Sequence, residues 1–345
     1  MTATSRTRTR PAPARRRLVA TVAACALVAL LVGACSPDLP QPDAPPAPAV
    51  APAALTVPQS ERVLTSLGEV LTASDEALDP GALAPRVEGP ALAMRTAEYV
   101  RASATAGAKP PTALPTNALA MVVPQTTDWS RTQLVVTEQP DDLQAQRILV
   151  LRQDDPRALY KLWGWARLMP GSQMPATAPA DAGSETLAAD DSSLLLTPTD
   201  ALTQFMDVAA NGAASQYAAS FAASPLVQEM EDLRAEARSG IGSAGTAATS
   251  YEMDPNPATA LRTVDGGAIV TGTFTAVSRM TVTLDGATIG LSDPFYAALA
   301  GATSAAHESK RTFTGIVVLY VPPAGSQAQV QVLAGELVVT GVTAS

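Results

Sequence analysis

The sequence predicts an α+β fold with two tandem domains, and two observations predict it. Apolar residues at helical spacing are followed by β-rich runs, and this order, two helices and then an antiparallel meander, occurs twice over comparable lengths. Low-complexity stretches also separate the two repeats from each other and from the N-terminus. The predicted segments are a signal peptide at 1–34, a disordered Pro/Ala-rich tether at 35–56, a first domain at 57–170, a linker at 171–193 and a second domain at 194–345.

The first 35 residues contain a basic region, an apolar run and a cysteine, in that order. Six arginines and no Asp or Glu precede Cys35, and small residues follow the apolar run at 18–32. This layout is typical of a secretory signal, because a membrane span needs about 20 apolar residues. A cysteine directly after small residues predicts a bacterial lipoprotein signal, with diacylglycerol and palmitate on Cys35 and an anchor at the extracytoplasmic face of the cell membrane. A plain signal peptide is the alternative, and general or twin-arginine export both stay open.

Removal of the signal makes the chain strongly acidic. Six of the 23 Lys and Arg residues lie in the signal, which leaves 17 against 32 Asp and Glu and a net charge near −15. Nucleic acid and anionic headgroups repel such a chain, so we expect no nucleic-acid binding, and the lipid must hold the protein at the membrane. Cys25 leaves with the signal, so no intramolecular disulfide can form and hydrophobic burial must supply the stability.

The segment from Ser36 to Thr56 has the composition of a spacer. Its seven prolines are interleaved with Ala and a few acids, a composition that favours extended polyproline II at about 3.1 Å per residue and forms no core. It would hold the folded body up to ~60 Å from the bilayer.

The first domain is predicted to begin with two helices. Thr56 and Gln59 have the spacing of a capping box, and apolar residues then recur at helical spacing up to Leu78. A shorter helix is expected at 90–104. The β-rich runs that follow are 119–123, 133–137, 146–152 and 158–169.

The second domain repeats this order. Thr197 and Pro198 predict the start of a helix that ends at Asn211, and a second helix is expected at 225–239. The predicted strands are 249–253, 260–264, 268–284, 311–322 and 329–342. Asp265-Gly266-Gly267 predicts a hairpin turn between two of them.

A helical hairpin wrapped by a curved antiparallel sheet resembles the NTF2-like, or cystatin-like, α+β cone. The chain is also similar to uncharacterised lipoproteins of actinobacteria. The strings that carry this second resemblance are 135–140 (VVTEQP), 147–152 (RILVLR), 160–164 (YKLWG) and 320–325 (YVPPAG). The resemblance implies tandem NTF2-like domains and brings no catalytic motif with it. The cone hosts enzymes, binding modules and adaptors alike, so it leaves the function open.

The residue inventory argues against several chemistries. His307 is the only histidine and lies in a polar, loop-like segment, so no zinc site of His and Cys is available, and we predict no metal, cofactor or catalytic residue. The run 240–245 (GIGSAG) has the letters of a dinucleotide-binding motif, which needs a strand before it and a helix after it. Here the order is a helix and then a strand, so the glycines are better explained as a helix stop.

The aromatic residues of the first domain are the candidate ligand-binding group. Trp163 and Trp165 are two apart and therefore share one face of a strand with Lys161 and Arg167, and Tyr160 is nearby. Such a face could line the cavity of a cone and hold an apolar or acidic ligand. The alternative is packing of both tryptophans against the helical hairpin.

These observations predict a non-enzymatic, membrane-anchored envelope protein that acts by binding an envelope protein or a small apolar ligand. One alternative is a dehydratase or isomerase that uses a buried carboxylate as general base, with Glu138 as candidate and Arg152 as its charge partner. A third hypothesis is a structural role, in which the second domain is an assembly surface.

Overall fold

The first described helix begins at its predicted cap. In the computed structural model, which describes residues 50–141 and 144–345, α2 spans Val57–Ala77. The Gln59 N–H donates to the Thr56 hydroxyl, and the Thr56 N–H donates to the Gln59 side chain at 2.8 Å, which closes the capping box. Leu64, Leu67 and Leu71 form the buried face of the helix.

The signal peptide, Cys35 and most of the tether lie outside the described residues. The described part of the tether is joined to the folded unit: Ala53 pairs with Gln125, and the Ala54 N–H donates to the Pro124 carbonyl at 2.8 Å. Within the described ranges, no helix has the length and apolar character needed to cross a membrane.

The rest of the first half follows the predicted order. The elements are η1 (Pro80–Leu83), α3 (Gly89–Ala104), β1 (Ala118–Val122), β2 (Pro124–Gln125), β3 (Arg131–Thr137), β4 (Arg147–Gln153), β5 (Lys161–Leu168) and β6 (Ser184–Glu185). Each of the four predicted strands overlaps an observed one, and the two-residue strands β2 and β6 are additions.

The second half contains the predicted helices and strands together with one further helix. Its elements are α4 (Pro198–Asn211), η2 (Gly212–Ala214), η3 (Ala218–Ser220), α5 (Pro225–Ile241), η4 (Gly242–Ala244), β7 (Gly245–Met253), β8 (Thr259–Arg262), β9 (Ala268–Val282), β10 (Ile289–Gly290), α6 (Pro294–Ala300), β11 (Ser304–Ala305), β12 (Glu308–Val321) and β13 (Gln331–Ala344). The glycines at 240–245 span the end of α5, η4 and the first residue of β7, so the order is helix and then strand, and the strand-then-helix context of a nucleotide-binding motif is absent there.

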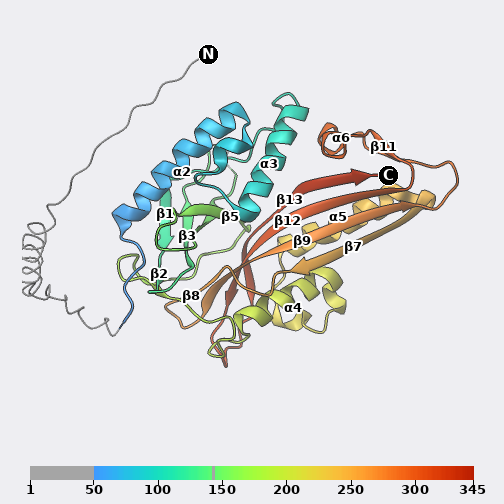
Figure 1. Ribbon diagram of the computed structural model, residues 1–345. Coiled ribbons are helices and arrows are strands. Elements are labelled where there is room, and N and C mark those ends of the chain that lie inside the picture. Colours follow the sequence, from blue (N-terminus) through green and yellow to red (C-terminus); the bar gives the residue numbers. More distant parts are fainter. Residues whose placement is uncertain (1–49, 142–143) are drawn as a thin grey trace, which may run out of the picture. The chain divides into compact units, whose positions relative to one another are not determined.

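A nine-stranded antiparallel sheet runs through the described unit, beside the two-stranded pairs β2-β6 and β10-β11. Its strand order is β1-β3-β4-β5-β13-β12-β9-β7, and β8 pairs with the end of β9 that β7 leaves free. Figure 1 shows α2 over the β1 and β3 part, α3 over β5 and the neighbouring β13 and β12, and α4 and α5 along β9 and β7. The predicted α+β class is therefore confirmed.

The two halves of the sheet meet at β5 and β13. Only Arg167 with Gly335 and Leu168 with Ala334 are paired there. The predicted linker adds further contacts, since Thr186 in it pairs with Leu261. The segments 57–170 and 194–345 thus share a sheet and lie in one compact unit, Val50–Ser345. Their independent folding stays a prediction.

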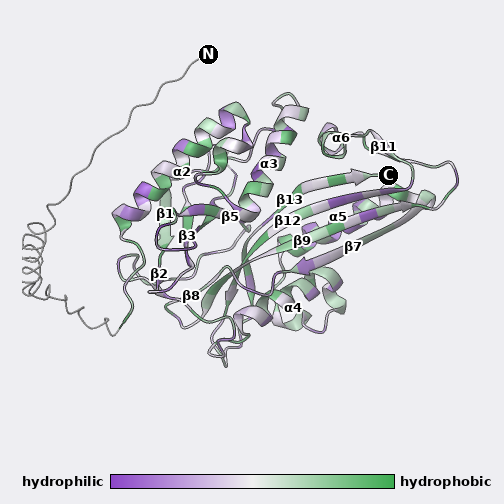
Figure 2. Ribbon diagram, in the orientation of Figure 1, coloured by the Kyte–Doolittle hydropathy of each residue, from purple (hydrophilic) through white to green (hydrophobic). Residues whose placement is uncertain are grey.

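The largest hydrophobic core also draws on both halves. Leu149 and Trp165 of the first half belong to the same buried cluster as Ile269 and Ile316 of the second, and all four are fully buried. Figure 2 shows polar and apolar residues alternating along α2 and α3, as expected for helices with one face on a core. Burial of apolar surface, worth roughly 25 cal/mol per Å², therefore joins the halves more strongly than the two-pair ladder alone.

Candidate functional site

The two tryptophans predicted to bind a ligand lie in the core. Trp165 is 0% exposed and Trp163 is 8% exposed. Trp163 packs against Gly89 at the start of α3, and the Arg95 guanidinium of the same helix lies 6.0 Å from the Trp165 ring centre. Neither lines a pocket described below. Their ligand-binding role stays a prediction, and their burial favours the packing alternative.

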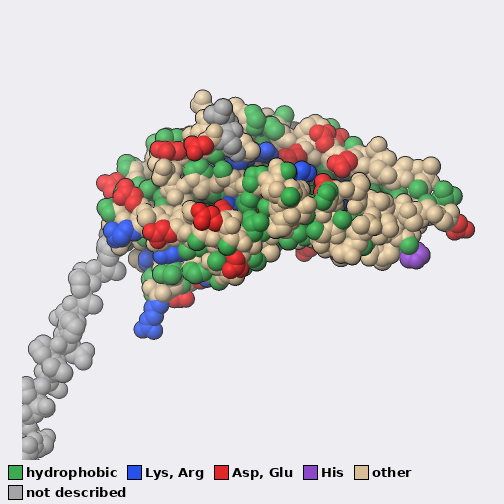
Figure 3. Space-filling model, turned by 90° about the horizontal axis from the view of Figure 1, so that it is seen from above, with side chains coloured by type: hydrophobic (Ala, Val, Ile, Leu, Met, Phe, Trp, Pro, Cys, Tyr) green, Lys and Arg blue, Asp and Glu red, His purple; other side chains and the backbone are tan. Residues whose placement is uncertain are grey.

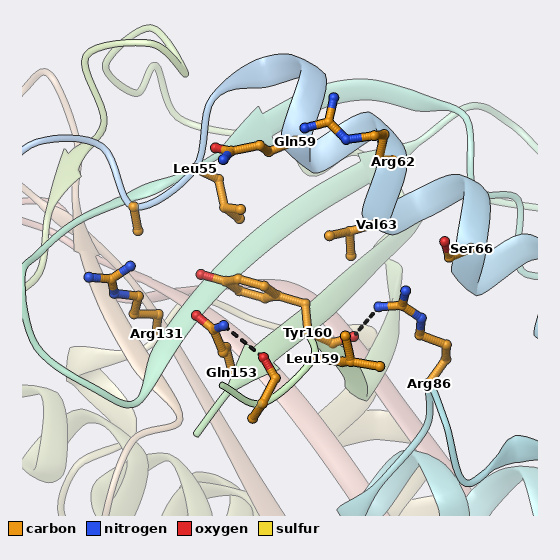
Figure 4. A pocket seen from close by; sticks show the side chains of 12 residues that line it. Leu55, Gln59, Arg62, Val63, Ser66, Arg86, Arg131, Gln153, Leu159 and Tyr160 are labelled. Atoms are coloured by element: carbon orange, nitrogen blue, oxygen red, sulfur yellow. Dashed lines mark hydrogen bonds between the residues drawn. The ribbon is translucent and has the colours of Figure 1, made fainter. Parts of the chain in front are cut away.

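Tyr160, the third predicted residue, lines an open pocket with a volume of about 390 Å³ (Figure 4). We call it the arginine pocket. It lies between the start of α2, the segment after η1, the start of β3, the end of β4 and the loop before β5. Its lining residues are Ala54, Leu55, Gln59, Arg62, Val63, Ser66, Arg86, Arg131, Gln153, Ala158, Leu159 and Tyr160.

Backbone carbonyls orient two of the three arginines of this pocket. Arg86 Nη1 donates to the Tyr160 carbonyl at 3.2 Å. Arg131 Nε donates to the Asp128 carbonyl at 3.2 Å, and its guanidinium carbon lies 3.9 Å from the Trp129 ring centre. The exposed side chain of Arg62 makes no hydrogen bond or ion pair with any described residue.

No carboxylate neutralises these arginines among the described residues. None of the lining residues is Asp or Glu, and no ion pair joins Arg62, Arg86 or Arg131 to a described acid. Three other described arginines, Arg157, Arg234 and Arg238, also have no ion pair but lie outside this pocket, whereas seven pair with carboxylates. The seven are Arg95, Arg101, Arg152, Arg167, Arg262, Arg279 and Arg311. Acidic side chains are scattered over the face in Figure 3, and three of the described arginines without an ion pair meet in this one pocket.

The Tyr160 hydroxyl is a buried donor without a partner. The residue is 5% exposed, and its hydroxyl oxygen makes no hydrogen bond with the described residues. Burial raises the pKa of Tyr160 to about 12, against the opposing effect of the Arg131 charge, so the hydroxyl keeps its proton at neutral pH. A buried polar group without a partner costs about 1–3 kcal/mol, which a ligand oxygen could recover.

The amide acceptors of the pocket are already in use. Gln59 Oε1 accepts from the Thr56 N–H at 2.8 Å, and Gln153 Oε1 accepts from Trp129 Nε1 at 3.3 Å. The arginines keep N–H groups that no described residue engages. The arginine pocket is therefore rich in donors and poor in acceptors, a chemistry that suits an oxyanion.

The residues of the enzymatic alternative do not come together. Glu138 is exposed and accepts a long hydrogen bond from Asn117, at 3.4 Å, while Arg152 pairs with Asp154 at 2.6 Å. The sequence reading missed Glu336 on β13, whose pKa is raised to about 7 by burial. Glu336 lines none of four pockets formed by described residues.

A second charged cluster connects α2 and α3 and is saturated by its own members. Arg95, 1% exposed, pairs with Asp75 and with Glu98, and the Tyr99 hydroxyl donates to Asp75 at 2.6 Å. Burial and the Asp75 carboxylate raise the pKa of Tyr99. Thr112 donates to Glu98 from the loop after α3. Paired in this way, the cluster holds the two helices together and offers no free site.

In the part of the chain that the structure describes, no group of three or more His, Cys, Asp or Glu side chains is suited to hold a metal ion.

The arginines of the pocket could not be recognised from the sequence, because Arg62, Arg86 and Arg131 come from three distant segments with no shared motif. What distinguishes them is that they line one pocket and form no ion pair with a described acid.

Comparison with known proteins gives one match. No curated protein and no solved structure matches the chain. Residues 51–343 match the family model described as a domain of unknown function (DUF8094), a range that covers the described unit almost completely. The chain therefore belongs to the DUF8094 family.

Proposed function

We propose that this protein is a non-enzymatic, membrane-anchored binding protein of the cell envelope that captures a small anionic ligand in the arginine pocket. One observation carries the proposal: Arg62, Arg86 and Arg131 line an open pocket and have no carboxylate partner among the described residues. Guanidinium groups that no carboxylate neutralises attract anions. An anionic ligand is favoured over the small apolar ligand considered from the sequence.

The arrangement is prepared for binding. Arg86 and Arg131 are fixed by backbone carbonyls, so little side-chain freedom is lost when a ligand arrives. Hydrogen bonds between an arginine and an anion contribute about 1.5–3 kcal/mol each, more than neutral ones. Two or three such contacts support a micromolar to millimolar dissociation constant after the cost of association.

The anchor and the finer fold assignment belong to the same proposal. Lipidation of Cys35 would place the arginine pocket outside the cell membrane at the end of a Pro-rich tether. Each half has two long helices followed by antiparallel strands, an order that supports tandem NTF2-like domains, although α3 of the first half also packs on β13 and β12 of the second. Cys35→Ser should move the protein from the membrane fraction to the soluble fraction, and intact-mass measurement should show the loss of the lipid. Unchanged sedimentation with membranes would rule out the anchor.

Calorimetric titration of the full chain tests the binding function. Inorganic phosphate, sulfate and succinate serve as anions, and choline and glucose as the cationic and neutral comparisons. We expect binding of at least one anion and none of choline or glucose. Arg86→Gln and Arg131→Gln should each weaken anion binding at least about tenfold, because each removes a charge-assisted hydrogen bond.

The matched control is Arg157→Gln. Arg157 is exposed in the loop before β5 and lies outside the pocket lining, so its loss changes the net charge equally without touching the site. We expect it to bind anions like the unmodified chain. Equal weakening by all three variants, or no binding of any anion, would contradict the proposal.

A further inference from the structure

We infer that the anion is a phosphate monoester, and that the Tyr160 hydroxyl completes its binding site. This inference rests on the proposed function and names the ligand class. Three features of the arginine pocket support it: the amount of positive charge, the directions from which donors arrive, and an apolar wall beside them.

The amount of charge favours a dianion. The pocket lining contributes three guanidinium groups, and no described acid opposes them. A carboxylate brings one negative charge, whereas a phosphate monoester carries about −1.5 to −2 at neutral pH and has three strong acceptor oxygens. The monoester therefore balances more of the charge that the fold has placed there.

The donors surround the pocket and do not lie along one wall. In Figure 4, Arg62 comes from α2 above, Arg86 stands on one side, Arg131 on the other, and Tyr160 lies between the last two with its hydroxyl on the Arg131 side. A tetrahedral group presents its oxygens in several directions and can accept from opposite walls. A planar carboxylate accepts in one plane only.

The Tyr160 hydroxyl gives the site a neutral donor. It has no partner in the described structure, and nine-tenths or more of the residue is buried. The fold thus pays the desolvation cost of this hydroxyl before any ligand binds, and a phosphate oxygen beside Arg131 would recover it. Other buried donors of the described structure, such as Trp165 Nε1, also lack a partner, and the Tyr160 hydroxyl differs from them because its residue lines the arginine pocket.

The apolar wall indicates an ester instead of free phosphate. Leu55, Val63 and Leu159 line the same pocket, and Leu159 is 52% exposed at its mouth. Inorganic phosphate would leave this surface in water, whereas the carbon substituent of a monoester would cover it. Burial of one methylene contributes about 0.8 kcal/mol, so a short alkyl chain should raise affinity measurably.

The experiment ranks defined probes by calorimetry on the full chain in detergent. The probes are butyl phosphate, inorganic phosphate, sulfate and acetate. We expect butyl phosphate to bind about tenfold more tightly than inorganic phosphate and more tightly still than acetate. Affinity for butyl phosphate should fall as pH is lowered through about 6, where the monoester loses its second charge, whereas affinity for sulfate should stay constant.

The decisive variant is Tyr160→Phe, which removes only the hydroxyl. Since that hydroxyl has no partner in the described residues, the variant should keep or raise the melting temperature. It should weaken butyl phosphate binding about five- to tenfold, the effect of one lost hydrogen bond. A control variant, Tyr217→Phe, changes a tyrosine outside the pocket lining and should leave binding unchanged.

The two proposals fail in different ways. Binding of sulfate, succinate and butyl phosphate with equal affinity, or no effect of Tyr160→Phe, would overturn the monoester and leave general anion capture standing. No binding of any anion would overturn both.

The phosphate monoester could belong to a lipid headgroup or to a soluble molecule. A second experiment distinguishes these two sources. The full chain is placed in phosphatidylcholine vesicles with or without phosphatidic acid, and its affinity for butyl phosphate is measured in each. Weaker apparent affinity in the presence of phosphatidic acid supports the inference with the lipid as the source. Unchanged affinity supports it with a soluble ester as the source.

Discussion

Glu336 shows how one residue can make stability depend on pH. It lies on β13, and burial raises its pKa from the ordinary 4.5 to about 7. The nearby Arg167 and Arg147 charges oppose the shift, whereas those of Glu98 and Glu229 add to it. The native state therefore holds the proton more tightly than the unfolded chain between about pH 4.5 and 7.

The raised pKa of Glu336 predicts the direction in which stability changes with pH. The free energy of unfolding should fall as pH rises through that window, because the unfolded chain releases the proton first. Glu336→Gln should flatten the decline and be more stable than the unmodified chain above pH 7, by on the order of 2 kcal/mol. Urea unfolding at several pH values from 5 to 8 measures it.

The control for this prediction is Glu252→Gln. Glu252 is exposed on β7, and its replacement should leave the pH dependence of stability as it is in the unmodified chain. A parallel pH dependence in Glu336→Gln and the unmodified chain would show that the Glu336 carboxyl titrates normally.

Among the elements, those with strong local signals were predicted best. The capping box at Thr56, the Thr197-Pro198 start and the Asp265-Gly266-Gly267 turn each fix a boundary through neighbours in sequence, and each occurs as expected. The long strands β9, β12 and β13 were recognisable because their apolar runs exceed what a loop contains.

The elements that were missed depend on contacts from elsewhere. The helix α6 has seven residues, too few for a helical period to show, although its Asp293 cap and Pro294 are local signals that could have found it. The strands β2 and β6 have two residues each and exist because they pair with one another across a separation of about sixty residues. The predicted strand at 158–169 includes the loop that carries Tyr160, but β5 begins only at Lys161, because the turn at Asp155 extends further than the sequence indicates.

The candidate site illustrates the same limit. Tyr160 was singled out because it is an aromatic residue beside Trp163 and Trp165, yet it faces a different environment from theirs. The arginines that give the pocket its character stand in segments whose proximity only the fold creates. Sequence spacing shows which residues are neighbours within one helix or strand. It could not predict this pocket, because residues from several elements line it.

At the scale of the whole molecule, the shared sheet and core predict how the protein unfolds. Residues from both halves lie in one buried cluster, and β5 pairs with β13. We therefore expect a single cooperative transition in denaturant. All three tryptophans lie in the first half, so tryptophan fluorescence reports on that half, whereas far-ultraviolet circular dichroism reports on both.

The two signals should give the same midpoint. Two separated transitions would instead show that 57–170 and 194–345 fold independently, as the repeated sequence pattern predicts. Weakening the shared core tests the coupling further. Ile316→Ala on β12 should lower the midpoint seen by tryptophan fluorescence as much as that seen by circular dichroism, because its side chain packs against Gly164 of β5.

The attachment of the entering chain to β2 has a mechanical consequence. Force applied along the residues before Val50 reaches the bridge between Ala53 and Gln125 and the Ala54–Pro124 hydrogen bond before it reaches α2. These contacts therefore bear the force before the capped start of α2 does. Such a force would break these contacts first, and the helix that carries Arg62 would keep its position until they were lost.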